Sequence, residues 1–599
     1  MRRRLLAPTL LAQILAAPAA AQSRMLWPGV TFDTGVQFTS NGPVAINILT
    51  GPRPGGTTTL APALSNETLT GTETLTAIQR RTAATATTAG VNGDFFTFAS
   101  GVPSGVLMRE GQLASPPSDE RASAGVLTDG TLDIRRVSFV GTWQGTGARR
   151  TLARFNKLLT GNGIALYTQA WGPATPAVAG ATAAILFPFP AATPNTDLVA
   201  PVTEIRAGAA PVPIPPGGAV LVAKGAAAVA ALAAEAPVGQ LVTSRLVFKP
   251  DWPGVVAAIG GGPQIVRDGG AIFRAGELFT TSQLGPRAPR SAIGQLADGR
   301  IILVAVDGRQ PGYSVGMTNF ELAQTLVRLG AVTGMALDSG GSTTMAFDGA
   351  LLNRPSGPER SISTALQFEY TGVFVQPAVA TVSPDGDGVA DRQSLRYKVV
   401  RPSTVTVRLV GPDGSVAYEA TAAKQPGSYG VAFPPADGSA SPAPTPPPAP
   451  TPSSRTASST SPTPVQGRWQ LTVSATDDIG QPSEMTQSFL VNTTVGFLST
   501  SPAKLFLPPA GRDLRISWKQ TKAARVVVTV ETAAGEVLRT LAKRTYAAGT
   551  QGVTWNGLDR ARTPVKGGRY VVRVVAKNAL GALDLARTLR VQRIAGPAR

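Results

Sequence analysis

A diverged internal repeat in the last third of the chain is the feature that most constrains its fold. Residues 430–433 (GVAF) correspond to residues 552–555 (GVTW), and residues 467–473 (GRWQLTV) correspond to residues 568–574 (GRYVVRV). These segments are short and rich in β-branched and aromatic residues, as strands with one buried face are. The repeat therefore predicts two all-β domains, at residues 380–493 and 500–599.

The first copy is interrupted by a segment rich in Pro, Ser, Thr and Ala, at residues 439–466. Such a composition cannot bury a core, so we expect this segment to be disordered or PPII-like. The second copy has only a short loop at the corresponding place. We therefore expect an insertion in a hairpin of the first β domain, not a linker between domains. Both copies resemble the hook-capping-protein family of immunoglobulin-like β-sandwich domains, which implies that fold for each.

The first β domain opens with three carboxylates at alternate or near-alternate positions, Asp385, Asp387 and Asp391. Carboxylate oxygens are the ligands that Ca²⁺ prefers, which predicts a structural calcium site. The loop lacks the twelve-residue spacing and the terminal Glu of an EF-hand. A simple Asp/Gly turn is therefore the alternative interpretation.

Residues 22–375 form a block rich in Gly, Thr and Ala that we expect to be one α+β domain with a mixed sheet. Residues 44–49 and 301–306 are typical of strands. Residues 73–81 and 319–329 have the spacing of amphipathic helices, and Gly330 ends the second.

The chain has 599 residues and contains neither cysteine nor histidine. This composition excludes disulfides, thiolate chemistry, a Ser–His–Asp triad and any zinc site built on imidazole. An enzyme with this composition must take its acids and bases mainly from Asp and Glu.

The N-terminus predicts export. Three arginines follow Met1, residues 5–17 are apolar, and small residues follow at 19–21, which is typical of a secretory signal peptide over residues 1–21. The apolar stretch is too short to span a membrane, and no other stretch resembles a transmembrane segment. We expect a secreted or cell-envelope-associated protein.

The second β domain is strongly basic. Residues 504–599 contain 19 Lys and Arg against five acidic residues, a net charge of +14 within a chain whose formal charge is +19. This charge favours binding to an anionic envelope polymer, with a merely soluble basic surface as the alternative. No nucleic-acid-binding motif is visible, so we do not expect nucleic acid as a partner.

Within residues 335–345 (MALDSGGSTTM), an apolar run ends in a carboxylate, and two glycines are then followed by three hydroxyl residues, Ser342, Thr343 and Thr344. A strand that ends this way places Asp338 at the edge of a sheet. Gly340 and Gly341 allow the backbone to approach a ligand, and Ser342 and Thr343 offer hydroxyls. The pattern favours a site for an anionic or sugar-like ligand, and a plain glycine turn is the alternative.

Other polar and glycine-rich motifs precede this loop in a fixed order. They are residues 92–96 (NGDFF), 260–263 (GGGP), 290–294 (RSAIG) and 307–309 (DGR), with residues 73–75 (ETL), 155–156 (FN) and 167–172 (YTQAWG) beside them. Each is weak alone, but the ordered set over residues 65–370 resembles the phosphodiester glycosidase family. Ser339 departs from the pattern, since many relatives have a third glycine there.

The resemblance implies hydrolysis of a sugar-1-phosphate diester, and the residue chemistry agrees with it. Such a substrate has a fixed negative charge and an anomeric carbon that becomes oxocarbenium-like. The candidates for catalysis are carboxylates, and those for substrate binding are cations, polar groups and aromatic rings. The catalytic candidates are Asp338, Asp307, Asp94 and Glu73; the binding candidates are Asn92, Gly93, Arg290, Ser291, Arg309, Gly340, Gly341, Ser342, Thr343, Tyr167, Trp171 and Arg360.

Several candidates have a structural alternative. Glu73 suits a helix start, Tyr167 and Trp171 suit core packing, and Arg360 suits the surface. The sequence thus predicts an exported glycoside hydrolase of sugar-phosphate glycans, with a non-catalytic carbohydrate-binding or adhesion protein as the alternative.

Overall fold

The computed structural model describes residues 22–208, 210–273, 276–435, 464–507 and 513–593. The expected signal peptide therefore lies outside the described residues, as does most of the Pro/Ser/Thr-rich segment. The chain divides into two compact units, residues 1–371 and 372–599. Among the described residues, no helix is long and apolar enough to cross a membrane.

The first unit contains a large antiparallel sheet whose middle strands are its most apolar. Ile301–Val306 is fully buried, as a central strand requires, and pairs on both sides. The strand order is β1 (Gln22–Trp27), β2 (Val30–Thr39), β3 (Gly42–Gly51), β22 (Ile301–Val306), β21 (Arg290–Leu296), β23 (Ala331–Ala336), β19 (Gln264–Arg267) and β20 (Gly270–Ala271).

Two five-stranded sheets complete the part of this unit that carries the site. One has the order β7 (Gln112–Ser115), β6 (Leu107–Arg109), β18 (Val255–Gly260), β8 (Ala122–Leu127) and β9 (Leu132–Arg136). The other has the order β25 (Ala350–Leu351), β24 (Met345–Phe347), β5 (Thr87–Asn92), β26 (Thr364–Tyr370) and β4 (Thr58–Leu64).

Between β9 and β18 the chain forms a further eight-stranded sheet with its own core. Its order is β11 (Arg150–Thr151), β10 (Ser138–Gln144), β17 (Leu241–Lys249), β15 (Asp197–Gly208), β14 (Ala181–Leu186), β16 (Ala219–Lys224), β13 (Gly163–Thr168) and β12 (Arg154–Phe155). Only the β12–β13 pair is parallel, so this sheet is mixed.

Helices are few and short. Those of the first unit are α1 (Leu75–Thr82), α2 (Ala226–Glu235), α3 (Thr281–Leu284) and α4 (Asn319–Arg328), with 3-10 turns η1 (Ser65–Glu67) and η2 (Gly340–Ser342). A capping box of Thr318 and Glu321 begins α4, and Leu322 and Leu326 bury its apolar face. The predicted α+β class is confirmed, with strands dominating.

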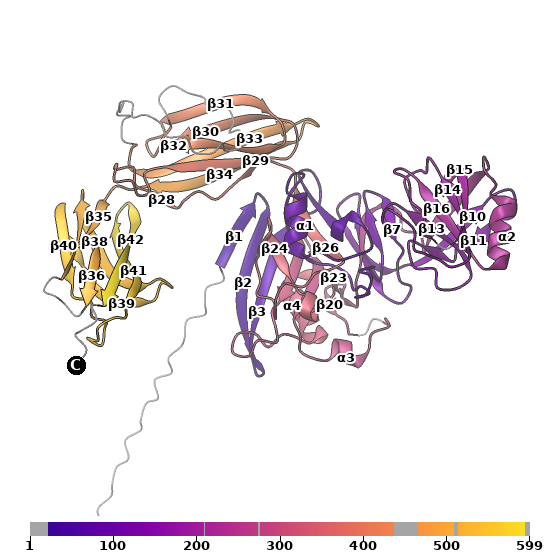
Figure 1. Cartoon of the computed structure of the whole chain (residues 1–599), viewed down its shortest axis with the longest axis horizontal. Helices are drawn as coiled ribbons and strands as arrows, with labels where there is room; N and C mark the ends of the chain where they lie inside the picture. The colour runs from indigo at the N-terminus through magenta and orange to yellow at the C-terminus, as the bar shows by residue number, and fades with distance from the viewer. Residues whose placement is uncertain (1–21, 209, 274–275, 436–463, 508–512, 594–599) are drawn as a thin grey trace, which may run out of the picture. The chain divides into compact units, whose positions relative to one another are not determined.

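The second unit consists of two β-sandwiches, orange and yellow in Figure 1. In the first sandwich, one sheet has the order β27 (Phe374–Val375), β29 (Gln393–Val399), β32 (Gly427–Phe433). Its other sheet has the order β28 (Thr381–Val382), β34 (Pro482–Val491), β33 (Gly467–Asp477), β30 (Ser403–Val410), β31 (Val416–Lys424). In the second sandwich, one sheet has the order β35 (Val495–Ser501), β37 (Leu514–Gln520), β40 (Gly549–Trp555). Its other sheet has the order β36 (Lys504–Leu507), β42 (Gly581–Arg593), β41 (Gly568–Asn578), β38 (Ala524–Thr532), β39 (Val537–Tyr546).

The two sandwiches have equivalent strand orders, as the internal repeat predicts. Two details differ from expectation. Residues 374–375 pair with β29, so they lie in the first sandwich and not in the domain before it. The Pro/Ser/Thr-rich segment falls between β32 and β33, which belong to different sheets, so the prediction of a hairpin was wrong: it joins the two sheets of one sandwich.

Candidate functional site

Asp338 lies where β23 ends, in a loop followed directly by η2. Its N–H donates to the carbonyl of Gly93 at 3.0 Å, and its Oδ1 accepts the N–H of Ser339 at 2.8 Å. Burial raises the pKa of Asp338 to about 6, while the Ser342 hydroxyl, the Ser339 N–H and the charges of Arg360 and Arg121 lower it. The residue as a whole is partly exposed. Asp338 is therefore a largely enclosed carboxylate that ionises close to neutral pH.

Asn92, at the end of β5, holds the Asp338 loop in place. Its Nδ2 donates to the Asp338 carbonyl at 2.8 Å, and its Oδ1 accepts the Ser291 hydroxyl at 2.5 Å and the Thr344 N–H at 3.2 Å. Asn92 and Ser291 are fully buried. Both predicted binding residues therefore position the loop, and their polar groups face the protein. Gly93 is also packed tightly, because a Cβ there would meet the Thr364 hydroxyl at 2.5 Å.

Asp94 is the second carboxyl group at this place and is only 2% exposed. Its oxygens accept the N–H groups of Phe95 at 2.8 Å and Gly105 at 2.6 Å. Burial raises the pKa of Asp94 to about 7, although these N–H groups and the charges of Lys157 and Arg121 oppose the rise. Burial thus places the pKa of both Asp94 and Asp338 near neutral pH, as is frequent for carboxyl groups at functional sites.

Arg121 is a site residue that the sequence analysis missed. Its guanidinium lies 4.9 Å from the ring centroids of both Phe95 and Phe279, and its charge lowers the pKa of Asp94 and of Asp338. Its Nη1 is buried without a hydrogen-bond partner among the described residues. A buried donor without a partner needs an explanation, and a bound ligand would supply one. Its only sequence signal was indirect: Phe95, which it contacts in space, belongs to the motif at residues 92–96.

The two loop glycines make room for two further guanidinium groups. A Cβ at Gly340 would lie 3.1 Å from Nη2 of Arg309, and a Cβ at Gly341 would overlap the guanidinium of Arg360. Arg360 also lies 5.5 Å from the Phe98 ring centroid. Neither arginine donates a hydrogen bond to the residues that the structure describes, so their donors remain available for an anion.

Hydroxyl groups in the same loop are also unsatisfied. Oγ of Ser342 and Oγ1 of Thr343 are buried and have no partner in hydrogen-bond geometry among the described residues. Ser342 is still close enough to Asp338 to lower its pKa. The structure thus brings the predicted residues of this loop together around one carboxylate.

Arg290 holds the segments next to the Asp338 loop together through its hydrogen bonds. Its five N–H groups are occupied by the carbonyls of Met317, Gln283, Leu284 and Pro286 and by the Ser339 hydroxyl. Burial, followed by the charge of Arg309, lowers the pKa of Arg290 to about 10. Arg290 borders a cavity of about 160 Å³ with Arg309, Ser339 and Phe95, and no carboxylate borders it. Arg290 therefore supplies positive charge but no free donor.

Asp307 and Glu73 are held in structural networks. Asp307 is 1% exposed, and its oxygens accept from Tyr313, Asn353, Asn47 and the Arg354 N–H. Burial raises its pKa against these bonds. Glu73 precedes α1 and forms an ion pair with Arg81 at 3.0 Å. Both carboxylates are therefore satisfied by neighbouring protein groups.

Tyr167 and Trp171 lie in the core. They are 0% and 4% exposed and pack edge to face at 5.3 Å, and the Tyr167 hydroxyl donates to the Lys157 carbonyl at 2.9 Å. Their ring faces are not open to a ligand. Core packing, the alternative in the sequence analysis, describes them.

Asp385, Asp387 and Asp391 lie together in the first sandwich, each with an oxygen within 4.8 Å of the others. Burial, then the like charges of Asp387 and Asp391, raises the pKa of Asp385 to about 6. Three close carboxylates fit a hard cation such as Ca²⁺. Asp391 also accepts three backbone N–H groups, from Asp385, Gly386 and Gly388, which is the geometry of the predicted turn.

Comparison with known families identifies two regions of the chain. The model of the family described as Phosphodiester glycosidase matches residues 195–369, and that of the FlgD Ig-like domain matches residues 511–579. Both predicted resemblances are thus confirmed over these residues. The first match includes Asp338, Arg309 and Arg360, while Asp94 and Arg121 lie before it.

Individual relatives are distant. The uncharacterized SPbeta prophage-derived protein YomE of Bacillus subtilis is 34% identical over 147 residues, which is 24% of this chain and 22% of YomE. A hypothetical protein from Synechocystis has a similar structure, with a TM-score of 0.50 and 27% identity over 59% of this chain and 64% of that chain. The catalytic domain of zebrafish N-acetylglucosamine-1-phosphodiester alpha-N-acetylglucosaminidase, auto-inhibited by its pro-peptide, aligns over 59% of this chain and 84% of that chain, with 14% identity and a TM-score of 0.30. This chain therefore spans about a fifth of YomE and less than two thirds of the Synechocystis protein.

Proposed function

From the match of residues 195–369 to the phosphodiester glycosidases, we propose that the first unit hydrolyses sugar-1-phosphate diesters. The observation that carries the proposal is the pair of arginines, Arg309 and Arg360, placed over Gly340 and Gly341 beside Asp338 with open donors. Guanidinium groups bind phosphate oxygens in a planar fork, so a phosphodiester fits next to this carboxylate.

In the proposed reaction, water replaces the phosphate at the anomeric carbon. The bond between that carbon and the phosphate oxygen breaks and the phosphate leaves with the bonding electrons. The sugar gains the hydroxyl of the water, and the remaining proton of that water passes to the solvent. Asp338, ionised above about pH 6, faces the positive charge that develops on the sugar. Asp94, buried behind the Asp338 loop, fixes the Phe95 and Gly105 backbone through its two oxygens, and Arg309 and Arg360 hold the phosphate.

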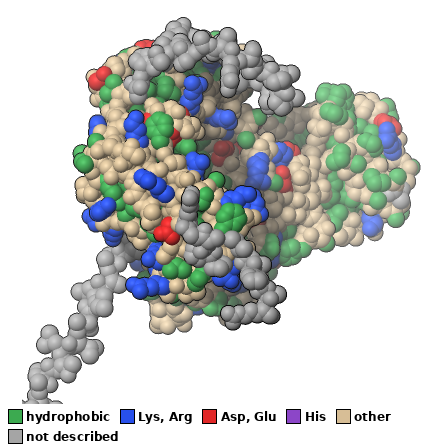
Figure 2. Space-filling view, turned by 60° about the vertical axis from the view of Figure 1, so that its left-hand side comes forward, with side chains coloured by type: hydrophobic (Ala, Val, Ile, Leu, Met, Phe, Trp, Pro, Cys, Tyr) green, Lys and Arg blue, Asp and Glu red, His purple; other side chains and the backbone are tan. Residues whose placement is uncertain are grey.

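We further propose that the protein acts outside the cytoplasm, on an envelope or extracellular glycopolymer, and that its basic second sandwich holds it near anionic polymer. Lys and Arg outnumber Asp and Glu on the face of the molecule shown in Figure 2, in keeping with the net charge of the chain. Attraction of this kind raises the local concentration of an anionic substrate.

The direct test is release of free sugar from glycosyl phosphodiesters, such as a UDP-sugar and a phosphate-linked glycan. We expect Asp338→Asn to lower kcat by about 100-fold or more, since carboxylate catalysis contributes about 10²–10⁴-fold. Asp298→Asn is the matched control, because this exposed Asp pairs with Arg300 in a surface turn. Equal rates for wild type and Asp338→Asn remove Asp338 from the mechanism. Glycan binding by a wild type that hydrolyses no phosphodiester favours a carbohydrate-binding or adhesion protein instead.

A further inference from the structure

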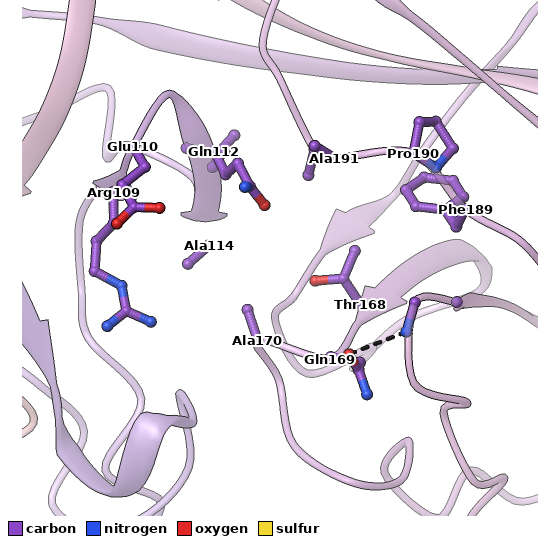
Figure 3. A pocket seen from close by; sticks show the side chains of 14 residues that line it. Arg109, Glu110, Gln112, Ala114, Thr168, Gln169, Ala170, Phe189, Pro190 and Ala191 are labelled. Atoms are coloured by element: carbon purple, nitrogen blue, oxygen red, sulfur yellow. Dashed lines mark hydrogen bonds between the residues drawn. The ribbon is translucent and has the colours of Figure 1, made fainter. Parts of the chain in front are cut away.

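A larger cavity, of about 570 Å³, lies elsewhere in the first unit and shares no lining residue with the Arg290 cavity. The β6–β7 hairpin borders it on one side, and the end of β13 and residues 189–192 border it on the other (Figure 3). Its volume is that of a site for a small ligand of one or two rings.

The lining combines amide groups with apolar surface. Gln112 lies on one side, and Thr168, Gln169, Phe189 and Pro190 lie on the other (Figure 3). Oε1 of Gln169 accepts the Gly217 N–H at 3.2 Å, which fixes this amide and leaves its Nε2 as a donor. Hydroxyl groups suit such amides, and the C–H face of a sugar ring suits Phe189 and Pro190.

The charges at the cavity do not favour an anion. Arg109 forms an ion pair with Glu67 at 2.9 Å, so its charge is balanced, and Glu110 stands next to it in the lining. The described lining holds no other cation. A neutral ligand that carries hydroxyl groups therefore fits better than a phosphate or a carboxylate.

Strand β7 connects this cavity to Asp94. Ala114 lines the cavity, and the next residue, Ser115, donates its hydroxyl to the Gly105 carbonyl at 2.8 Å. The Gly105 N–H in turn donates to Asp94 Oδ2 at 2.6 Å. The cavity wall and the Asp94 carboxylate are thus linked through Ser115 and Gly105.

We propose that the 570 Å³ cavity is a subsite for one or two neutral sugar residues of the glycan that carries the phosphodiester, an assignment that rests on the proposed function for its biological role. The subsite is separate from the arginine pair, so the charged and the neutral parts of the substrate are recognised in different places.

The test compares two substrates, a small glycosyl phosphodiester and the same diester carrying a neutral oligosaccharide. Ala191→Trp fills the cavity from an exposed lining position. Gln112→Ala removes an amide whose side chain forms no hydrogen bond to the residues that the structure describes. Ala230→Trp, on the exposed side of α2, is the matched control. We expect Ala191→Trp to lower kcat/KM about tenfold for the oligosaccharide substrate through KM, with Gln112→Ala weaker in the same direction. We expect neither variant to change kcat/KM for the small substrate. Ala230→Trp should leave kcat/KM unchanged for both substrates. Equal effects on both substrates, or none on the larger one, overturn the subsite.

A binding measurement separates this inference from the proposed reaction. Calorimetry with mannotriose and chitotriose, which contain no phosphate, should show binding to the wild type and at least a tenfold loss in Ala191→Trp. Such binding in a protein that hydrolyses no phosphodiester supports the subsite and rejects the enzyme. Hydrolysis of small diesters without any oligosaccharide effect or binding supports the enzyme and rejects the subsite.

Discussion

Asp94 is a carboxyl group whose ionisation opposes folding. Its pKa is about 7 in the folded protein against an ordinary value of 3.8, so between about pH 4 and pH 7 the folded state binds a proton that the unfolded chain has lost. Stability therefore decreases as pH rises through this window, and the same holds for Asp338 up to about pH 6.

Replacing Asp94 by Asn should remove its share of this pH dependence. We expect the Tm of Asp94→Asn, relative to that of the wild type, to increase as pH rises from 4 to 7 and to reach its highest relative value above pH 7. Thermal unfolding at several pH values measures it, with exposed Asp119→Asn as the control. A constant Tm difference across this range contradicts the burial of an ionisable Asp94.

Arg121 lowers the pKa of both Asp94 and Asp338, because its positive charge stabilises their ionised forms. We expect Arg121→Met to raise both pKa values and move the acidic limb of the pH–rate profile to higher pH. Arg121→Lys, which keeps the charge over the Phe95 and Phe279 rings, should move it much less. A loss of rate in both variants without any shift of the profile indicates a packing role only.

At the scale of elements, Gly260 ends β18 where only a hydrogen atom fits. A Cβ there would overlap the carboxylate of Asp94, so Gly260→Ala should displace that group. We expect kcat to fall about tenfold to 100-fold and the free energy of unfolding to fall by about 1–3 kcal/mol. Gly35→Ala in β2 is the matched control, because nothing lies within 4 Å of its added Cβ. Similar activity in the two variants contradicts the close packing at Asp94.

The sequence predicted elements well where periodicity and end signals agree. Residues 301–306 are β22 itself, and α4 begins at the predicted Asn319 because Thr318 and Glu321 cap it. It did not predict the sheet between β9 and β18, in which β10 pairs with β17 and β13 pairs with β16, strands that are not consecutive in the chain. The site residues followed the same division. The Asp338 loop carries its own glycine signal, whereas Arg121 is a single cation whose role depends on two rings far apart in the chain. Buried Tyr167 and surface-stacking Tyr have the same sequence signature, so only the structure separates them.

At the scale of the whole molecule, the second sandwich places like charges opposite each other on neighbouring strands. Arg525 faces Lys577, and Arg569 faces Arg590, all four exposed. Such cross-strand pairs are destabilising by themselves, and a bound polyanion would relieve the repulsion.

We therefore expect the protein to bind dextran sulfate and not neutral dextran, with an affinity that decreases as salt increases. Replacing these four residues by Gln should weaken binding at least tenfold and slightly raise the Tm. Co-sedimentation at low and high salt measures binding. Unchanged binding by the fourfold variant excludes this sheet as the polymer-binding surface.

The side chain of Asn92 joins parts of the chain that are 246 and 252 residues apart, at Asp338 and Thr344. Contacts of such separation form only after most of the domain has been synthesised and closed. A ribosome-bound or proteolysed chain that ends before residue 344 thus holds Asp94 without its partner loop. Appearance of the proposed hydrolase activity would consequently time the completion of folding in this unit, and a refolding assay could follow it with a substrate instead of a spectroscopic probe.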